Sequence, residues 1–125
     1  MSDKKIVVVD DDESIRKTFF LLLKKQYRVY LAKDSEEALR DFKGLKFDLL
    51  IADLKLPRLN GLELIARFRE LGFRGEVILI TGHADLVRIE DLDRYAIGHF
   101  FSKPLDLRVL SRSIDCLLQP KELPS

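Results

Sequence analysis

Five short apolar runs alternate with stretches of helical periodicity along this chain. The runs cover residues 6–9, 28–31, 49–52, 77–80 and 98–102. Runs of this length that are apolar on both faces are typical of strands inside a parallel sheet. Between the runs, apolar residues recur every three or four positions, which predicts an amphipathic helix after each strand. These helices are expected over residues 13–25, 35–43, 61–71, 85–94 and 106–118.

Polar residues and glycine mark the ends of several predicted helices. Asp12 or Ser14 can cap the first helix, and Asp34 followed by Glu37 is a capping pattern for the second. Gly72 follows the apolar stripe of the third helix and favours its end. Residues 85–94 carry the weakest helical pattern, with a spacing of three between apolar positions and many acids, so we expect a marginal, mobile helix there.

Strands that alternate with helices predict a parallel sheet covered on both faces. Right-handed crossovers then bring the carboxyl ends of all the strands to one edge. Asp10 and Asp11 end the first strand, Asp53 the third, Thr81 the fourth and Lys103 the fifth. Five polar side chains that are far apart in the sequence are therefore expected to converge.

The converging side chains suggest a particular chemistry. Three carboxylates repel one another unless a cation joins them, and Mg²⁺ prefers such hard oxygen ligands. A lysine and a hydroxyl beside the ion would neutralise a phosphoryl group and donate hydrogen bonds to its oxygens. Since a carboxylate can itself accept a phosphoryl group, the sequence predicts metal-assisted phosphoryl transfer to an aspartate.

Composition narrows the classes of partner and compartment. The chain has 22 basic and 21 acidic residues, so its net charge of +1 does not indicate nucleic acid or an anionic membrane. The single cysteine, Cys116, cannot form an internal disulfide. No run resembles a signal peptide or reaches the length of a membrane span, so we expect a cytoplasmic protein.

We expect one domain over residues 1–118, followed by a tail or the start of a linker over residues 119–125, which contain two prolines. If 125 residues is the natural length, the domain stands alone and acts through protein contacts. If the tail is a cut linker, an effector domain follows it.

The chain resembles the response regulator receiver domains of bacterial two-component signalling over about residues 5–118. The resemblance rests on Asp10-Asp11 after the first strand, Asp53 followed by Pro57 and Gly61, Thr81 after the fourth strand, and Lys103-Pro104 with its expected cis bond. It implies a flavodoxin-like, doubly wound α/β fold with five parallel strands in the order 2-1-3-4-5 and five helices.

The resemblance also implies a role for each matching residue. Asp53 would be the phosphoacceptor, supplied by a histidine kinase or histidine phosphotransfer protein. Mg²⁺ or Mn²⁺ would be held by Asp10, Asp11, Asp53 and the backbone carbonyl of Lys55. The residues expected to contact the phosphoryl group are Thr81, the backbone of Gly82, and Lys103. Such a domain is a phosphoacceptor rather than an enzyme, with at most self-phosphorylation and self-dephosphorylation activity.

Two further roles follow from the resemblance. Thr81 and Phe100 would be the switch residues, and the output face would comprise residues 85–94, the strand around Phe100 and the last helix. That face would contact an effector domain, a downstream protein or a second copy. Lys55 and His83 hold positions that flank the path of attacking water in this family and would modulate dephosphorylation.

The chain departs from the family pattern in two places. Phe100 stands where tyrosine is frequent, so no hydroxyl is available there for an output contact. Ala96-Ile97-Gly98 replaces a segment that often begins with glycine, so the start of the fifth strand is expected to differ in shape.

Other interpretations of the same residues remain open. Asp10-Asp11-Asp12 also resembles the opening of haloacid-dehalogenase phosphatases, in which Asp10 would be the nucleophile and Asp12 the acid. A receiver-like docking module that is never phosphorylated is a third interpretation. His83 and His99 could be metal ligands by type, but we expect solvated loop residues. The pair Phe19 and Phe20 is expected in the core.

Overall fold

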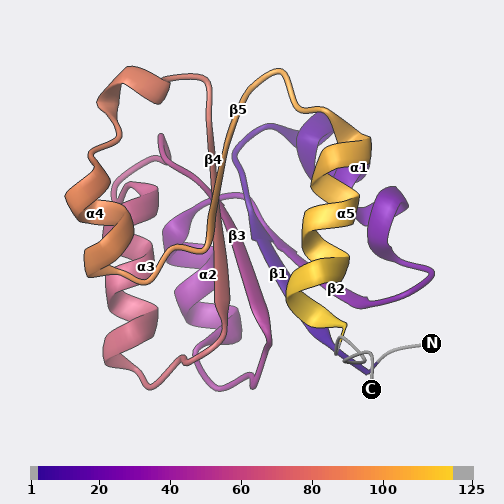
Figure 1. Cartoon of the computed structure of the whole chain (residues 1–125). Coiled ribbons are helices and arrows are strands. Elements are labelled where there is room, and N and C mark those ends of the chain that lie inside the picture. The colour runs from indigo at the N-terminus through magenta and orange to yellow at the C-terminus, as the bar shows by residue number, and fades with distance from the viewer. Residues whose placement is uncertain (1–2, 120–125) are drawn as a thin grey trace, which may run out of the picture.

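The computed structural model describes residues 3–119 (Figure 1). The strands are β1 Lys5–Val9, β2 Arg28–Ala32, β3 Leu49–Asp53, β4 Glu76–Thr81 and β5 His99–Ser102. The helices are α1 Glu13–Leu23, α2 Ser35–Phe42, α3 Gly61–Glu70, α4 Ile89–Arg94 and α5 Leu107–Leu118, with a short 3₁₀ helix, η1, over Ala84–Leu86. The expected tail lies outside the described residues, apart from Gln119.

All five strands are parallel, and their order is β2-β1-β3-β4-β5. Val9 pairs with Ala52, Asp53 with Ile80, and Thr81 with Ser102. The carboxyl ends of these strands therefore lie at the same edge. Both the α/β class and the expected strand order are confirmed.

Helices cover both faces of the sheet (Figure 1). On one face, Ile51 and Ile78 of the central strands pack with Phe19 of α1 and Ile114 of α5. On the other face, Leu50 and Leu79 pack with Leu64 and Phe68 of α3. Neighbouring residues of each strand point to opposite faces, so a strand buried on both faces must be apolar at every position.

Side chains and glycine define the helix ends, and the predicted roles of Asp12, Asp34 and Gly72 are confirmed. Asp12 and Asp34 cap α1 and α2 by accepting hydrogen bonds from backbone N–H groups. Asn60 and Glu63 form a capping box at the start of α3, with bonds of 2.9 and 3.1 Å. Gly72 adopts a φ of 101° just beyond the end of α3, a conformation that favours glycine.

The predicted helix over residues 85–94 is shorter than expected. Leu86 belongs to the separate turn η1, and α4 starts only at Ile89. The spacing of three between Leu86, Ile89 and Leu92 does not keep these side chains on one face of an α-helix, which turns every 3.6 residues. Leu92 packs against the core, whereas Ile89 is 76% exposed.

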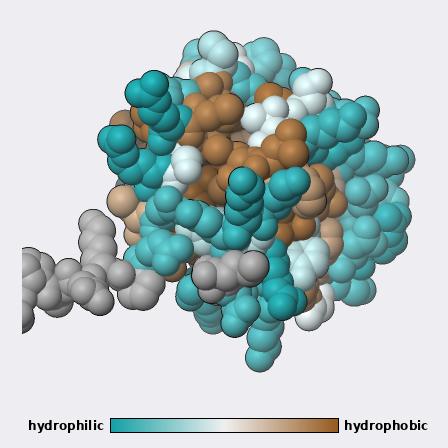
Figure 2. Space-filling view, turned by 90° about the vertical axis from the view of Figure 1, so that its right-hand side faces the viewer, coloured by the Kyte–Doolittle hydropathy of each residue, from teal (hydrophilic) through white to brown (hydrophobic). Residues whose placement is uncertain are grey.

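Phe19 and Phe20 of α1 were both expected in the core, and this prediction is wrong for Phe20. Phe19 is buried, but Phe20 is 40% exposed because it lies on the outer side of the helix. Figure 2 shows apolar surface gathered on the side formed by α1 and α5, and Leu107 and Val109 of α5 are also exposed. Among residues 3–119, no helix is long and apolar enough to cross a membrane.

Gly61, the first residue of α3, lies against the backbone at the end of β3. Its N–H donates a 2.8 Å hydrogen bond to the carbonyl of Leu54. A Cβ atom added at Gly61 would lie 2.3 Å from the carbonyl oxygen of Asp53. Only glycine permits this close approach, which fixes the loop that carries Asp53.

Replacing Gly61 by alanine should lower the free energy of unfolding by about 1–3 kcal/mol, because the backbone at Asp53 must shift to admit the methyl group. Gly44→Ala is the matched control, since an added Cβ there meets no atom within 4 Å. Urea unfolding followed by circular dichroism measures both. Equal midpoints for the two variants would contradict the close approach.

Candidate functional site

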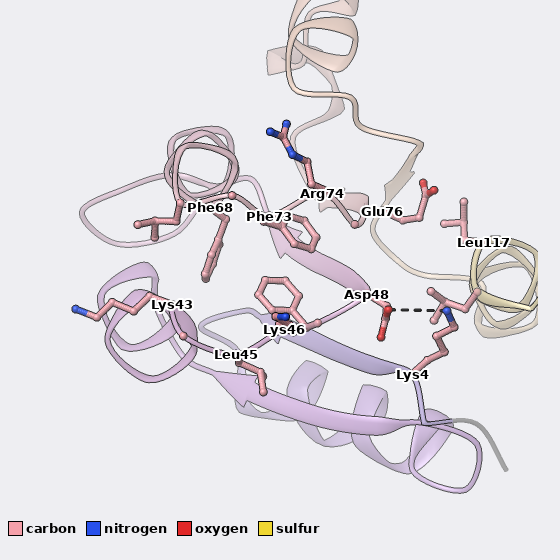
Figure 3. Close-up of a pocket in the computed structure, with 16 residues that line it drawn as sticks. Lys4, Lys43, Leu45, Lys46, Asp48, Phe68, Phe73, Arg74, Glu76 and Leu117 are labelled. Carbon is pink, nitrogen blue, oxygen red and sulfur yellow. Dashed lines mark ion pairs between the residues drawn. The ribbon is translucent and has the colours of Figure 1, made fainter.

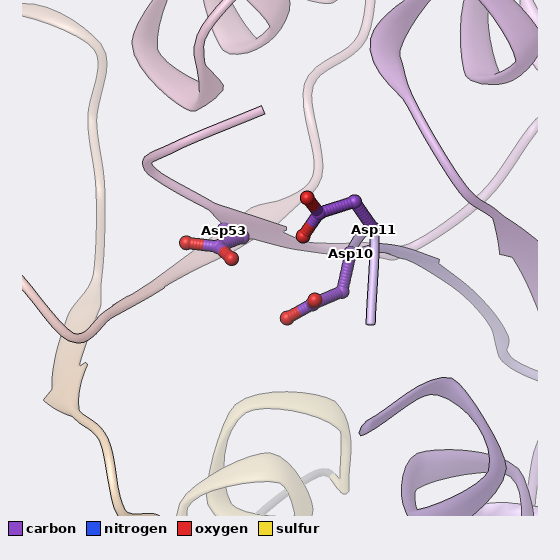
Figure 4. A group of neighbouring side chains, drawn as sticks. All are labelled: Asp10, Asp11 and Asp53. Atoms are coloured by element: carbon purple, nitrogen blue, oxygen red, sulfur yellow. The ribbon is translucent and has the colours of Figure 1, made fainter. Parts of the chain in front are cut away.

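Polar side chains gather at the carboxyl edge of the sheet, where β1, β3, β4 and β5 end. Asp10 and Thr81 are fully buried, Asp53 is 5% exposed, and Asp11 is exposed. Figure 4 shows Asp10, Asp11 and Asp53 together at the ends of β1 and β3. One carboxylate oxygen from each lies within 4.8 Å of the other two, so these three residues could hold a metal ion.

Asp10 is held from two directions. Its Oδ1 accepts a 2.9 Å hydrogen bond from the N–H of Asp12, and its Oδ2 lies 3.0 Å from Nζ of Lys103. Burial raises the pKa of Asp10, and the nearby charge of Asp53 adds to this, although the bonds from Asp12 and Lys103 oppose it. The ionised carboxylate is therefore costly here, and a further cation would stabilise it.

Asp53 shares the same lysine. Its Oδ2 accepts a 2.9 Å bond from Nζ of Lys103, and its Oδ1 accepts a 3.2 Å bond from the N–H of Lys55. The Lys55 side chain itself is exposed. Asp53 thus presents a carboxylate of fixed orientation that is accessible from one side.

Lys103 links the last strand to the first and third. Burial alone would lower its pKa, but hydrogen bonds to Asp53 and Asp10 and their charges raise the pKa above its usual value. Lys103 is therefore a stable cation. Its backbone N–H donates a 2.7 Å bond to the carbonyl of Thr81, and the bond to Pro104 is cis, as expected.

Thr81 ends β4 one strand away from Asp53. Its buried hydroxyl oxygen accepts a 2.8 Å hydrogen bond from the N–H of His83, which closes a tight turn around Gly82. Gly82 is exposed, and an added Cβ there would meet no atom within 4 Å. Space is therefore available beside the backbone at this position.

Phe100 lies on β5 and pairs with Leu79 of β4. Its ring is half-buried and packs against the core cluster that also contacts Val87, Leu92 and Tyr95. It therefore lies beside the middle of β4, two positions before the residue that pairs with Thr81, and its role as a switch residue stays a prediction.

Several candidate residues do not join the acidic group. Asp12 is exposed, and its Oδ1 accepts a 2.8 Å bond from Ser14, so it serves as a helix cap rather than as an acid beside Asp10. Within residues 3–119, the metal-binding group includes neither His83 nor His99. The ring of His99 stacks on Phe101 instead.

Arg16 of α1 borders the acidic group, and the sequence pattern does not identify it as part of the site. Its Nη1 donates a 2.7 Å hydrogen bond to the carbonyl of Asp10 and so fixes the backbone after β1. An arginine on the polar side of an amphipathic helix is ordinary, and only the fold brings it to this carbonyl.

Among the described residues, cavities also occur away from the acidic group. One, of about 690 Å³, is at the opposite edge of the sheet, and Lys4, Asp48 and Glu76 line it at the amino ends of the strands (Figure 3). Another, of about 370 Å³, adjoins the loop after Asp53 and is lined by Leu54, Leu62 and Leu86 among others. Neither cavity brings a further acid to Asp53.

Comparison with known proteins identifies the family. Residues 6–115 match the family described as response regulator receiver domain. The transcriptional regulatory protein GlrR of Escherichia coli (strain K12) is 30% identical over 93 residues, which cover 74% of this chain and 21% of that protein. The chain thus matches only a small part of that relative.

Solved structures agree with this match. The signal receiver domain of an HD domain-containing protein from Pseudomonas fluorescens Pf-5 is 29% identical, with a TM-score of 0.86 and coverage of 94% of this chain and 96% of that one. The response regulator protein TrrA from Thermotoga maritima, in complex with Mg²⁺–BeF, is 30% identical, with a TM-score of 0.78 and coverage of 92% and 99%. With its parallel sheet, its acidic group and a match over most of its length, this chain belongs to the response regulator receiver domain family of two-component signalling.

Proposed function

We propose that this chain is a cytoplasmic signalling switch in which Asp53 accepts a phosphoryl group from a histidine kinase or a histidine phosphotransfer protein. The observation that carries the proposal is the environment of Asp53. Its carboxylate is nearly buried, shares the Lys103 ammonium with Asp10, and lies beside Asp11. A carboxylate in this environment can accept a phosphoryl group, because positive charge beside it neutralises the phosphoryl oxygens as they approach.

A divalent cation fits this donor set. Asp10, Asp11 and Asp53 carry three negative charges, whereas Lys103 supplies one positive charge. These carboxylates, with the backbone carbonyl of Lys55, would hold Mg²⁺ or Mn²⁺. When bound, the ion neutralises charge on the phosphoryl oxygens.

The side chains divide the transfer between them. A carboxylate oxygen of Asp53 forms the new bond to phosphorus, while the bond from phosphorus to the donor's imidazole nitrogen breaks and leaves its electron pair on that nitrogen. Lys103 neutralises the phosphoryl oxygens, and Thr81 and the N–H of Gly82 donate hydrogen bonds to them. The domain is an acceptor with at most self-phosphorylation and self-dephosphorylation activity, not an enzyme with a separate substrate.

Phosphorylation then changes the surface formed by α4, β5 and α5. When Thr81 donates its hydroxyl hydrogen to the phosphoryl group, it moves toward Asp53 and leaves space into which Phe100 can turn. TrrA, a relative that is 30% identical, was solved in complex with Mg²⁺–BeF, which supports the binding of a divalent cation in the proposed function. The partner at the surface is an effector domain, a downstream protein or a second phosphorylated copy.

Acetyl phosphate with Mg²⁺ should label Asp53, and chelator should abolish the label because the acids are then left without their cation. Borohydride trapping followed by mass spectrometry locates the acyl phosphate. Asp53→Asn should remove the label. A label on Asp10 would instead support the phosphatase interpretation, and no label on any residue would support an unphosphorylated docking module.

The aspartyl phosphate should be lost several-fold faster in Lys55→Ala and in His83→Ala. Both side chains are exposed, Lys55 two residues after the acceptor and His83 two residues after Thr81, and we propose that their bulk hinders attacking water. Lys33→Ala controls for the loss of a positive charge at the same edge of the sheet. Unchanged decay of ³²P-labelled protein in both variants would reject this role.

Beryllofluoride with Mg²⁺ should perturb amide signals from residue 85 to residue 101, well beyond the residues that contact it. In Thr81→Ala this remote response should shrink while beryllofluoride still binds, whereas Thr81→Ser keeps the hydroxyl and should retain it. Two-dimensional NMR of the three proteins measures both effects. Perturbations confined to the neighbours of Asp53 in the parent protein would show that this switch mechanism is wrong.

A further inference from the structure

Arg69, near the end of α3, is bonded almost entirely to backbone carbonyls. Its Nη1 donates to Phe73 and Gly75 at 3.2 and 2.8 Å, its Nε to Tyr95 at 3.2 Å, and its Nη2 to Ala96 at 3.1 Å. A guanidinium has five N–H groups in one rigid plane, so four of the five are used here.

These four acceptors belong to two loops that are far apart in sequence. Phe73 and Gly75 lie between α3 and β4, whereas Tyr95 and Ala96 lie between α4 and β5. Figure 3 shows Phe73 beside the cavity at the amino edge of the sheet, and its ring lies 5.0 Å from the guanidinium carbon of Arg69. Arg69 therefore fastens the end of α4 to the loop that precedes β4.

No carboxylate among the described residues accepts a hydrogen bond from Arg69. Burial lowers the pKa of this guanidinium, while the charge of Glu76 opposes the effect and that of Arg74 adds to it. The side chain is thus stabilised by carbonyl dipoles rather than by an ion pair. Lysine, with a single compact ammonium group, cannot reach two carbonyls on each of two loops.

Tyr95 is the C-cap residue of α4 and Ala96 follows it, so Arg69 bonds the carbonyls at and just beyond the end of this helix. A positive charge at this position also complements the negative end of the helix dipole. Ala96 has a φ of 53°, in the left-handed region where a side chain is disfavoured, and the Ile97 N–H closes the end of the helix with a 2.9 Å bond to Leu92. The bonds from Arg69 hold this disfavoured conformation in place.

The other end of α4 has no comparable support. No side chain caps the helix at Arg88, Ile89 is 76% exposed, and none of the residues of α4 is buried. The segment that leads there from β4 begins with the turn closed by Thr81 and His83. A movement of Thr81 therefore acts on the loose end of α4.

We propose that Arg69 is a positioning residue that fixes the C-terminal end of α4, so that switching pivots this helix about Tyr95 and Ala96. The pivot rests on the proposed function, because phosphorylation supplies the movement of Thr81. The anchored segment from Ala96 to Gly98 leads directly into β5 and keeps Phe100 paired with Leu79. Phe100 then responds by turning its ring while its strand stays in place.

The test compares Arg69→Met, which removes every donor, and Arg69→Lys, which keeps the charge, with Arg67→Met on the exposed side of the same helix. Without ligand, amide exchange at Ile97 should be at least about tenfold faster in both Arg69 variants and unchanged in Arg67→Met. Wild-type exchange at Ile97 in a folded Arg69→Lys or Arg69→Met protein would overturn the proposal.

Addition of beryllofluoride and Mg²⁺ tests the pivot itself. In the parent protein, amide shifts over residues 85–89 should exceed those over residues 95–98 several-fold, and in the Arg69 variants the two segments should shift comparably. Equal shifts in the parent protein would overturn the pivot. If Arg69→Met does not fold, Arg69→Lys decides both measurements. If the parent protein shows neither a response to beryllofluoride nor an acyl phosphate, the proposed function is rejected. The exchange rate at Ile97 then still tests whether Arg69 fixes the end of α4.

Discussion

Two buried carboxylates share one lysine, and the arrangement of the sheet edge depends on that ammonium group. Nζ of Lys103 lies 3.0 Å from Asp10 and 2.9 Å from Asp53. A carboxylate removed from water without a positive partner costs several kcal/mol, so the burial of both acids depends on this shared ammonium group. The three residues can meet only because parallel pairing in register brings the ends of β1, β3 and β5 to one level.

The helices that cover the sheet are supported unequally, and α4 differs both from α1 and α5 and from its neighbour α3. On one side, α1 and α5 insert fully buried side chains such as Phe19, Leu110 and Ile114. On the other side, α4 contributes no buried residue and depends on Leu92, Tyr95 and the bonds from Arg69. The segment around α4 therefore belongs to the low-stability part of the fold, and a segment with so few buried contacts can move at low cost.

The sequence predicts those features that depend on local chemistry or on the rules of parallel sheets. Apolar runs give the strands, Asp12 and Asp34 give helix starts, and the common edge brings Asp10, Asp53 and Lys103 together. Helix α4 was predicted too long because Leu86 and Ile89 keep an apolar spacing yet find no core to cover. Periodicity reports which side chains could be buried, not whether another element covers them.

The roles of Arg16 and Arg69 leave no pattern in the sequence. Both side chains donate to backbone carbonyls, which every residue possesses, so no matching acid marks their partners. Phe20 is likewise ambiguous, because an apolar residue beside a core position is buried only if a neighbour reaches it.

The long sequence separation within the shared lysine bridge has a consequence for synthesis. Lys103 is 93 residues from Asp10 and 50 from Asp53, so the two acids leave the ribosome well before their counter-charge does. A nascent chain that has exposed Asp53 but not Lys103 lacks the cation that both buried carboxylates need. The acidic site can therefore form only after almost the whole domain has been translated, and a chain that terminates before Lys103 would lack a complete site.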